Sequence, residues 1–98
     1  MSSLEIRDPR LAAVVGDDVA FEKVAGGCLF TEGPLWHPDG FYYFVDIHRS
    51  ALYRLTPGKG PELVRADTGE GNGTTFDLHG RLVLCEGGNR RLTRTAVD

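Results

Sequence analysis

The segment TEGPLW at residues 31–36 decides the fold, because GNGTTF repeats its pattern at residues 71–76. Each segment carries an oxygen-bearing polar residue, then a glycine and, three positions later, an aromatic residue. The same offset of 40 positions aligns the following residues without a gap. The matched pairs are Glu32 with Asn72, Gly33 with Gly73, Trp36 with Phe76, Gly40 with Gly80, Asp46 with Glu86, Leu52 with Leu92 and Arg54 with Arg94.

A period of roughly 40–45 residues that holds four short strands is typical of a β-propeller blade. One four-stranded sheet cannot bury both of its faces alone, whereas neighbouring blades cover each other. The repeat therefore predicts an all-β chain that forms part of a β-propeller, open rather than closed, with a blade at residues 31–66 and a partial blade at residues 71–98. The alternative is a chance likeness between two β-meanders.

Runs of β-branched and aromatic residues between glycine- and proline-containing turns predict the strands. These runs cover residues 35–37, 41–47, 51–55, 62–65, 74–77, 81–86 and 90–95. Residues 19–25 also alternate between apolar and polar positions and predict one strand more. Residues 1–18 are expected to form an irregular N-terminal arm, in which residues 11–15 either make a single helical turn or stay extended.

Composition excludes several classes of protein. The chain has 98 residues and a net charge of -3, without the basic patch of a nucleic-acid-binding protein. No apolar run approaches the roughly 18 residues of a membrane span, and no secretory signal precedes the repeat, so we expect a cytoplasmic protein. Cys28 and Cys85 are far apart and are expected to be buried small hydrophobic residues, with a disulfide as the alternative.

Glu32 and Asn72 are the candidate site residues. Equivalent positions just before the innermost strand of consecutive blades would direct both side chains to one end of the central channel. Carboxylate and amide oxygens without histidine or cysteine suit a hard cation such as calcium or magnesium. The alternative is that Glu-Gly and Asn-Gly only form turns.

Other polar and aromatic residues are given structural roles. His37, His48 and His79 do not form a ligand set and are expected at turns or on the surface. Asp46 and Glu86 are expected to cap turns, with Glu86 near a pocket as the alternative. We expect a solvated strand face for the basic cluster of Arg90, Arg91 and Arg94, and a core between blades for Trp36, Phe41, Tyr43 and Phe76.

Two motifs resemble those of a known family. Residues 30–38, FTEGPLWHP, resemble the first-blade motif of the gluconolactonase family, which includes regucalcin (senescence marker protein) and luciferin-regenerating enzyme. Residues 72–77, 80–82, 85–86 and 88–91 are similar to its second-blade motif. The resemblance covers residues 19–94, which is most of the chain.

The resemblance implies a six-bladed propeller that hydrolyses sugar lactones or related esters with one divalent metal ion, usually calcium. It implies that Glu32 is a metal ligand and that Asn72 faces metal and substrate. Two positions depart from the family pattern: Gly87 replaces a usual histidine and Thr74 a usual leucine. Both departures bear on the substrate pocket.

The length of the chain limits these expectations. Fewer than two blades are present, and the later asparagine and aspartate of the family's site have no counterpart. We therefore expect no catalytic residue here, an incomplete metal site, an inactive chain when it is alone, and self-association through exposed blade faces and edges. The chain is the N-terminal part of a lactone hydrolase or, alternatively, a truncated non-catalytic propeller fragment that binds a partner or is vestigial. A binding propeller of another kind would not explain Glu32.

Overall fold

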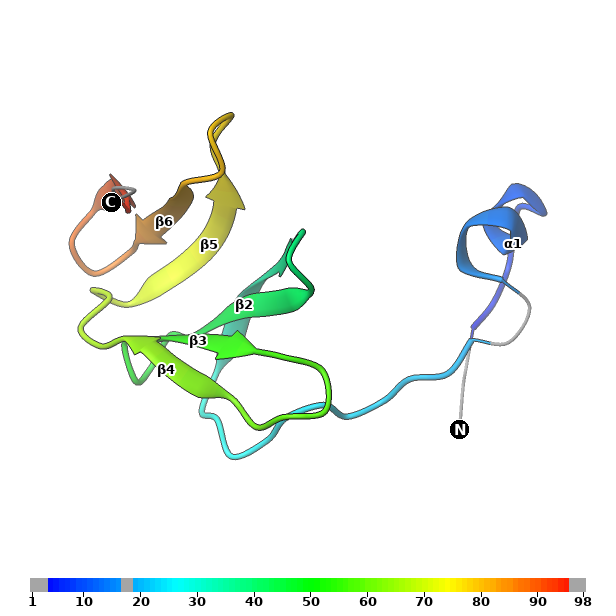
Figure 1. The fold of residues 1–98 in the computed structure, drawn as a ribbon, viewed down its shortest axis with the longest axis horizontal. Helices are drawn as coiled ribbons and strands as arrows, with labels where there is room; N and C mark the ends of the chain where they lie inside the picture. The colour runs from blue at the N-terminus through cyan, green and yellow to red at the C-terminus, as the bar shows by residue number, and fades with distance from the viewer. Residues whose placement is uncertain (1–3, 17–18, 96–98) are drawn as a thin grey trace.

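Two antiparallel β-sheets make up most of the computed structural model, which describes residues 4–16 and 19–95 (Figure 1). The first sheet has four strands in sequence order, β1 to β4, and the second has three, β5 to β7. The strands are β1 (Thr31–His37), β2 (Phe41–Asp46), β3 (Ala51–Leu55), β4 (Glu62–Arg65), β5 (Gly71–Phe76), β6 (Leu82–Glu86) and β7 (Arg91–Arg94). The all-β expectation is confirmed, and the two sheets do not close into a ring within the described residues.

The internal repeat is present in the strand register. Asp46 pairs with Thr31 in the first sheet, and Glu86 pairs with Gly71 in the second. Every residue pair between β6 and β7 also repeats, 40 residues later, a pair between β2 and β3. Register irregularities interrupt β1 and β5 at matching places. The two sheets are thus copies of one strand-and-turn plan.

The hydrophobic core lies between the two sheets. The first sheet contributes Val45 and Leu52, and the second contributes Leu82 and Leu84, none of them more than 9% exposed. Leu35, Tyr43, Ile47 and Phe76 pack against this cluster. Burial of these side chains is the main source of stability for a pair of sheets that are each too small to cover their own faces.

Three of the four aromatic residues expected in the core have that role, and one does not. Phe41 is buried, and Tyr43 and Phe76 pack against the core. Trp36 is 49% exposed and contacts Tyr42 with ring centroids 4.6 Å apart. The expectation was wrong for Trp36 because side chains alternate along a strand, and Trp36 follows Leu35, which faces the core.

The expectation that Cys28 and Cys85 are buried was also wrong. Cys28 is half-buried and Cys85 is exposed, and both thiols are free. Cys85 follows the buried Leu84 in β6 and therefore points to the outer face of the second sheet.

Residues 19–25 form no strand, which corrects a third expectation. Their apolar side chains are exposed, with Phe21 68% and Val24 59% accessible. The alternating pattern is present, but none of the seven strands in the described residues runs beside this segment. Without a neighbour, its backbone groups have no ladder partner and hydrogen-bond to water instead.

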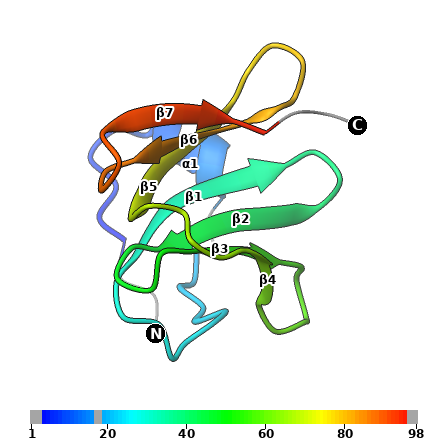
Figure 2. The same ribbon diagram turned by 90° about the vertical axis from the view of Figure 1, so that its left-hand side faces the viewer.

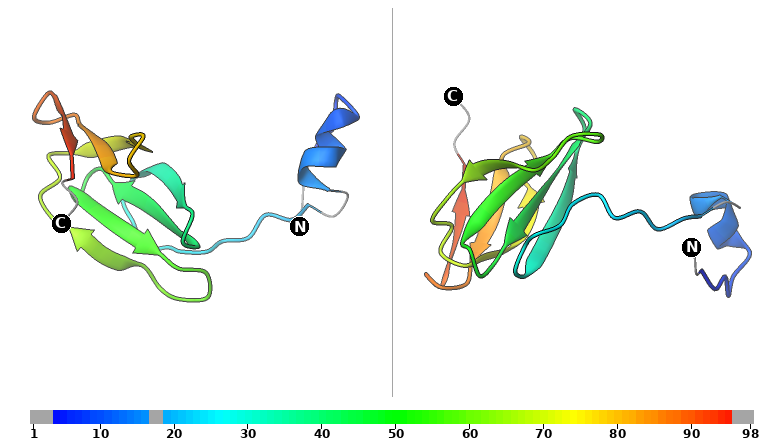
Figure 3. Two further views of the ribbon diagram at one scale, coloured as in Figure 1. Left: turned by 45° about the horizontal axis from the view of Figure 1, so that its top comes forward. Right: turned by 90° about the horizontal axis from the view of Figure 1, so that it is seen from below.

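The N-terminal arm contains a helix rather than wholly irregular chain. Helix α1 (Arg10–Val15) begins where Asp8 accepts a hydrogen bond of 2.9 Å from the Arg10 N–H, and it ends at Gly16, whose φ is 78°. No residue of α1 is buried, and the helix lies apart from both sheets (Figure 3). No helix in the described residues is long and apolar enough to cross a membrane. Parts of the expected arm, residues 1–3 and 17–18, lie outside the described residues.

Candidate functional site

The closest approach between the two sheets is where β1 lies beside β5 (Figure 2). The Thr74 hydroxyl donates a hydrogen bond of 2.7 Å to the carbonyl oxygen of Gly33. Gly33 is buried with a φ of 58°, and a Cβ atom at this position would collide with the carbonyl oxygen of Asn72. Only glycine fits here, since it alone has no side chain and adopts positive φ without strain.

Glu32 and Asn72 therefore lie on neighbouring strands, next to this contact. Both side chains are exposed. They lie within β1 and β5 rather than just before them, which corrects the expected placement. The strands begin earlier than the sequence indicated because Thr31 and Gly71 already pair with Asp46 and Glu86 ahead of each irregularity.

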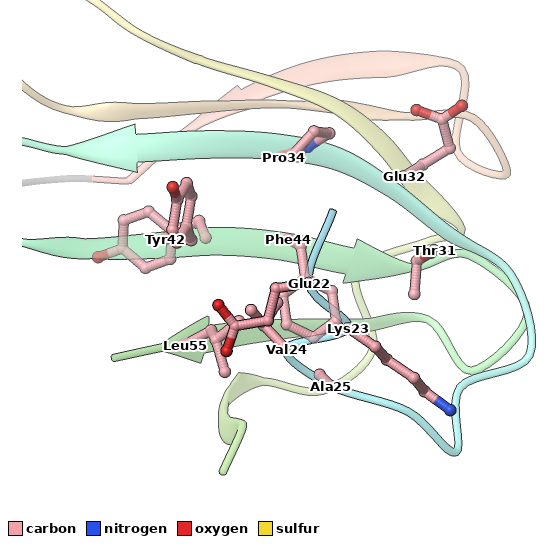
Figure 4. Close-up of a pocket in the computed structure, with 11 residues that line it drawn as sticks. Glu22, Lys23, Val24, Ala25, Thr31, Glu32, Pro34, Tyr42, Phe44 and Leu55 are labelled. Carbon is pink, nitrogen blue, oxygen red and sulfur yellow. The ribbon is translucent and has the colours of Figure 1, made fainter. Parts of the chain in front are cut away.

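The Glu32 carboxylate is accessible to a ligand but already makes one local contact. Its Oε2 accepts a hydrogen bond of 3.0 Å from the N–H of Gly33. Figure 4 shows the carboxylate near the start of β1, directed away from Glu22 and Lys23. The other carboxylate oxygen makes no hydrogen bond within the described part of the chain, so one oxygen of Glu32 is available to a cation.

The oxygen donors suit a hard cation in kind but not in number. Glu32 and Asn72 offer one carboxylate and one amide oxygen, whereas calcium takes six to eight oxygen ligands. Among residues 4–16 and 19–95, no group of three or more His, Cys, Asp or Glu side chains is arranged to hold a metal ion. The described residues do not by themselves fit a complete divalent-metal site.

Asp46 is buried and has a structural role. Its carboxylate accepts hydrogen bonds of 2.9 Å from the N–H of Leu29 and 3.1 Å from the N–H of Phe30. Burial would raise the pKa of Asp46, but these N–H groups and the Arg49 guanidinium outweigh that effect and lower it. Asp46 thus caps the segment that leads into β1, in addition to pairing with Arg49 in the turn that follows β2.

Glu86 is the matching buried carboxylate of the second sheet, and its side chain is fully engaged. Asn89, Thr93 and Arg91 donate hydrogen bonds of 2.8, 2.7 and 2.9 Å, and Arg65 of the first sheet donates one of 3.2 Å. These donors, led by Asn89, lower the pKa of Glu86 to about 2. Glu86 therefore caps its turn as expected and also joins the sheets, and it is not available as a pocket acid or base.

The basic cluster of Arg90, Arg91 and Arg94 is exposed, as expected, and two of its members also form ion pairs. Arg91 pairs with Glu86, and Arg94 lies 3.7 Å from the Asp77 carboxylate. The carboxylate of Asp77 also pairs with Arg81 at 2.6 Å. Sequence alone did not indicate these ion pairs, because they depend on which strand face each residue occupies.

His48 and His79 are exposed in turns, as expected, whereas His37 at the end of β1 is half-buried and packs against aromatic rings. His37 stacks on Phe41 with ring centroids 4.4 Å apart and meets the Phe76 ring at 5.4 Å. His48 contacts the edge of Phe30 at 5.4 Å, and His79 is exposed in a turn. No two of them share a site.

A groove that the sequence did not indicate lies on the outer face of the first sheet. Its volume is about 680 Å³, and it separates residues 22–25 from that face (Figure 4). Tyr42, Phe44, Leu55 and Pro34 form its apolar wall. Alternation along β2 could have located this wall once Tyr43 had been assigned to the core.

Comparison with known proteins identifies the family. The family model described as SMP-30/Gluconolactonase/LRE-like region matches residues 30–97, which include all seven strands and both candidate site residues. The chain belongs to this family. The resemblance found in the two motifs is thereby confirmed. No curated protein and no solved structure matched the chain.

Proposed function

We propose that residues 30–97 contribute the first two blades of a lactone hydrolase that acts on sugar lactones or related esters. The family match supports this proposal. The observation that carries it is the close packing of Gly33 on the Asn72 backbone, which sets the exposed side chains of Glu32 and Asn72 on adjoining strands. In this proposal each sheet is one blade of a six-bladed ring.

In this proposal Glu32 is a ligand of a divalent cation, calcium, and Asn72 contacts the substrate. A bound cation of this kind polarises a lactone carbonyl for attack by water. The Gly33 N–H orients one oxygen of Glu32, which leaves the other oxygen free for the cation. The remaining ligands would have to come from water or from polypeptide outside these two strands, because the fit is incomplete.

Terbium luminescence tests the role of Glu32 without requiring turnover. Terbium is a hard cation that replaces calcium, and Trp36, the single tryptophan, lies on the same strand as Glu32 and can sensitise its emission. We expect Glu32→Gln to weaken terbium binding by at least the roughly 10- to 100-fold that follows loss of an outer-shell partner. The matched control is Glu62→Gln, an exposed carboxylate on β4.

Calcium competition makes the binding assay specific. Calcium should displace terbium from the wild-type chain and from Glu62→Gln. Equal terbium affinity in Glu32→Gln and the wild type would refute the assignment of Glu32. Equal weakening by both substitutions would show diffuse binding to surface carboxylates and would refute it as well.

The second candidate is a non-catalytic propeller fragment, and the incomplete ligand set favours it for residues 1–98 alone. We expect these residues by themselves to show no calcium-dependent hydrolysis of gluconolactone, measured by acid release. Calcium-dependent turnover that is lost in Glu32→Gln and kept in Glu62→Gln would instead show that this chain is an enzyme.

A further inference from the structure

The two sheets pack against each other through opposite faces. The first sheet uses Val45 and Leu52, whereas the second uses Leu82 and Leu84. In the 40-residue repeat, Leu82 and Leu84 are equivalent to Tyr42 and Phe44, which lie on the outer face of the first sheet and line the groove. The interface is therefore head-to-tail: each repeat unit packs one face of its sheet on the next unit and the opposite face on the previous unit.

Each sheet consequently has one face without a neighbouring sheet among the described residues. The Trp36 face of the first sheet consists of Trp36, Tyr42, Phe44 and Leu55, of which Phe44 is half-buried and Leu55 is buried in the groove beside residues 22–25. The Leu92 face of the second sheet consists of Thr75, Val83, Cys85 and Leu92. Trp36 is 49%, Tyr42 40% and Leu92 68% exposed. Contiguous exposed apolar side chains of this kind mark interaction sites.

By the repeat, these open faces are equivalent to the two faces that already pack together in the chain. Cys85 and Leu92 are equivalent to Val45 and Leu52, which pack on Leu82 and Leu84 in the core. Trp36 is equivalent to Phe76, which the Tyr43 ring meets at 6.3 Å. The interface between the two sheets within the chain is thus equivalent to the one that a Leu92 face and a Trp36 face would form.

We propose that residues 1–98, when they are not part of a closed ring, associate: a second copy docks its Leu92 face on the Trp36 face of the first copy. This proposal rests on the second candidate function, the non-catalytic fragment. In that complex Cys85 of one copy lies against Tyr42 and Phe44 of the other. The groove of about 680 Å³ beside Tyr42, Phe44 and Leu55 provides space for the docking side chains. Residues 22–25, which border the groove, are not part of a sheet.

The docked interface is weaker than the one within the chain. Pro34 is equivalent to Thr74 and has no hydroxyl to donate to a carbonyl of the neighbouring copy, so the hydrogen bond to Gly33 has no counterpart. The ion pair between Arg65 and Glu86 is not reproduced either, because Arg65 lies on β4 and the second sheet has no equivalent fourth strand among the described residues. Association should therefore depend on concentration, and a head-to-tail contact yields closed rings or open filaments.

Sedimentation velocity and Trp36 fluorescence test the association. With increasing concentration of the wild-type chain, we expect the sedimentation coefficient to rise and the Trp36 emission to shift to the blue as the ring becomes buried. Leu92→Glu should raise the dissociation constant about tenfold or more, because docking would bury a carboxylate. The control is Leu78→Glu, which places the same charge at a fully exposed turn residue. A wild-type chain that stays monomeric over the whole range would overturn the proposal.

Disulfide trapping tests the predicted orientation. In a Cys28→Ser background, the cysteine introduced by Phe44→Cys should form a disulfide bond with Cys85 of another copy under oxidising conditions. The cysteine introduced instead by Leu78→Cys should not. The background variant alone should form no bond between two Cys85 residues, because the head-to-tail contact keeps them apart. A dominant bond between two Cys85 residues would show a two-fold arrangement and overturn the head-to-tail contact.

Discussion

The Thr74 hydroxyl donates a hydrogen bond of 2.7 Å to the carbonyl oxygen of Gly33, a residue 41 positions earlier in the chain. This bond joins β5 to β1 next to Glu32 and Asn72. It lies at the register irregularity of each strand, where ladder pairing is interrupted and the carbonyl is turned toward the other sheet. This hydroxyl group and the close packing of Gly33 on the Asn72 backbone together set the relative position of the two candidate site residues.

Thr74→Val should therefore destabilise the chain by about 1 kcal/mol, because the substitution removes the hydrogen bond and leaves the Gly33 carbonyl without its partner. Urea unfolding would show a lower midpoint with an unchanged slope. Thr75→Val is the matched control, since Thr75 is the adjacent residue and is exposed, and the substitution replaces a hydroxyl by a methyl group in the same way. Equal stability of the two variants would contradict a structural role for this bond.

Gly33→Ala should be more damaging than the loss of the hydrogen bond. The new methyl group would collide with the carbonyl of Asn72, and the positive φ of 58° adds backbone strain of about 1–2 kcal/mol for a residue with a side chain. We expect a clear fall in the melting temperature and weaker terbium binding as β1 and β5 separate. Gly60→Ala, where a methyl group meets nothing within 4 Å, should leave both unchanged. A stable Gly33→Ala variant would show that the strands approach less closely than the structure indicates.

Glu86 makes the free energy of unfolding depend on pH in the acid range. Its pKa in the folded chain is about 2, below the usual 4.5. A carboxyl group with a lowered folded pKa contributes stability above its unfolded pKa, and this contribution is lost as the pH falls. The melting temperature should therefore drop between pH 4.5 and 2.

Glu86→Gln isolates this contribution from those of Asp77 and Asp46, whose pKa values are also lowered. The variant should be less stable at neutral pH and should show a shallower pH dependence over the acid range. Glu62→Gln should keep the wild-type dependence. An unchanged slope in Glu86→Gln would refute the assignment of this acid sensitivity to Glu86.

Much of the fold was predictable because the 40-residue repeat and the strand-forming residues within it indicate the same strands. The aromatic and β-branched run at residues 41–47 became β2, and the expected strand at residues 51–55 matches β3 in full. Gly40 and Gly80 lie in the turn after the first strand of each unit and mark the same hairpin, with φ values of 94° and 77°. The failure at residues 19–25 has a different cause, since alternation reports that a segment can be a strand but not that it has a neighbour.

The equivalence of the two candidate site residues was predictable, but their geometry was not. The repeat identified Glu32 and Asn72 as equivalent, and the structure places them on adjoining strands. Their position within the strands depends on the register irregularities, which leave no clear mark in sequence. The closed network around Glu86 was missed because it is formed by side chains from three strands and a turn.

The matching register of β2–β3 and β6–β7 also bears on how such a chain changes in length. A gene that duplicates one 40-residue unit adds a sheet whose one face fits its predecessor and whose other face fits its successor. The insertion creates no new kind of contact to be optimised by selection. Growth or shortening by whole units is therefore the least disruptive change open to this protein in evolution.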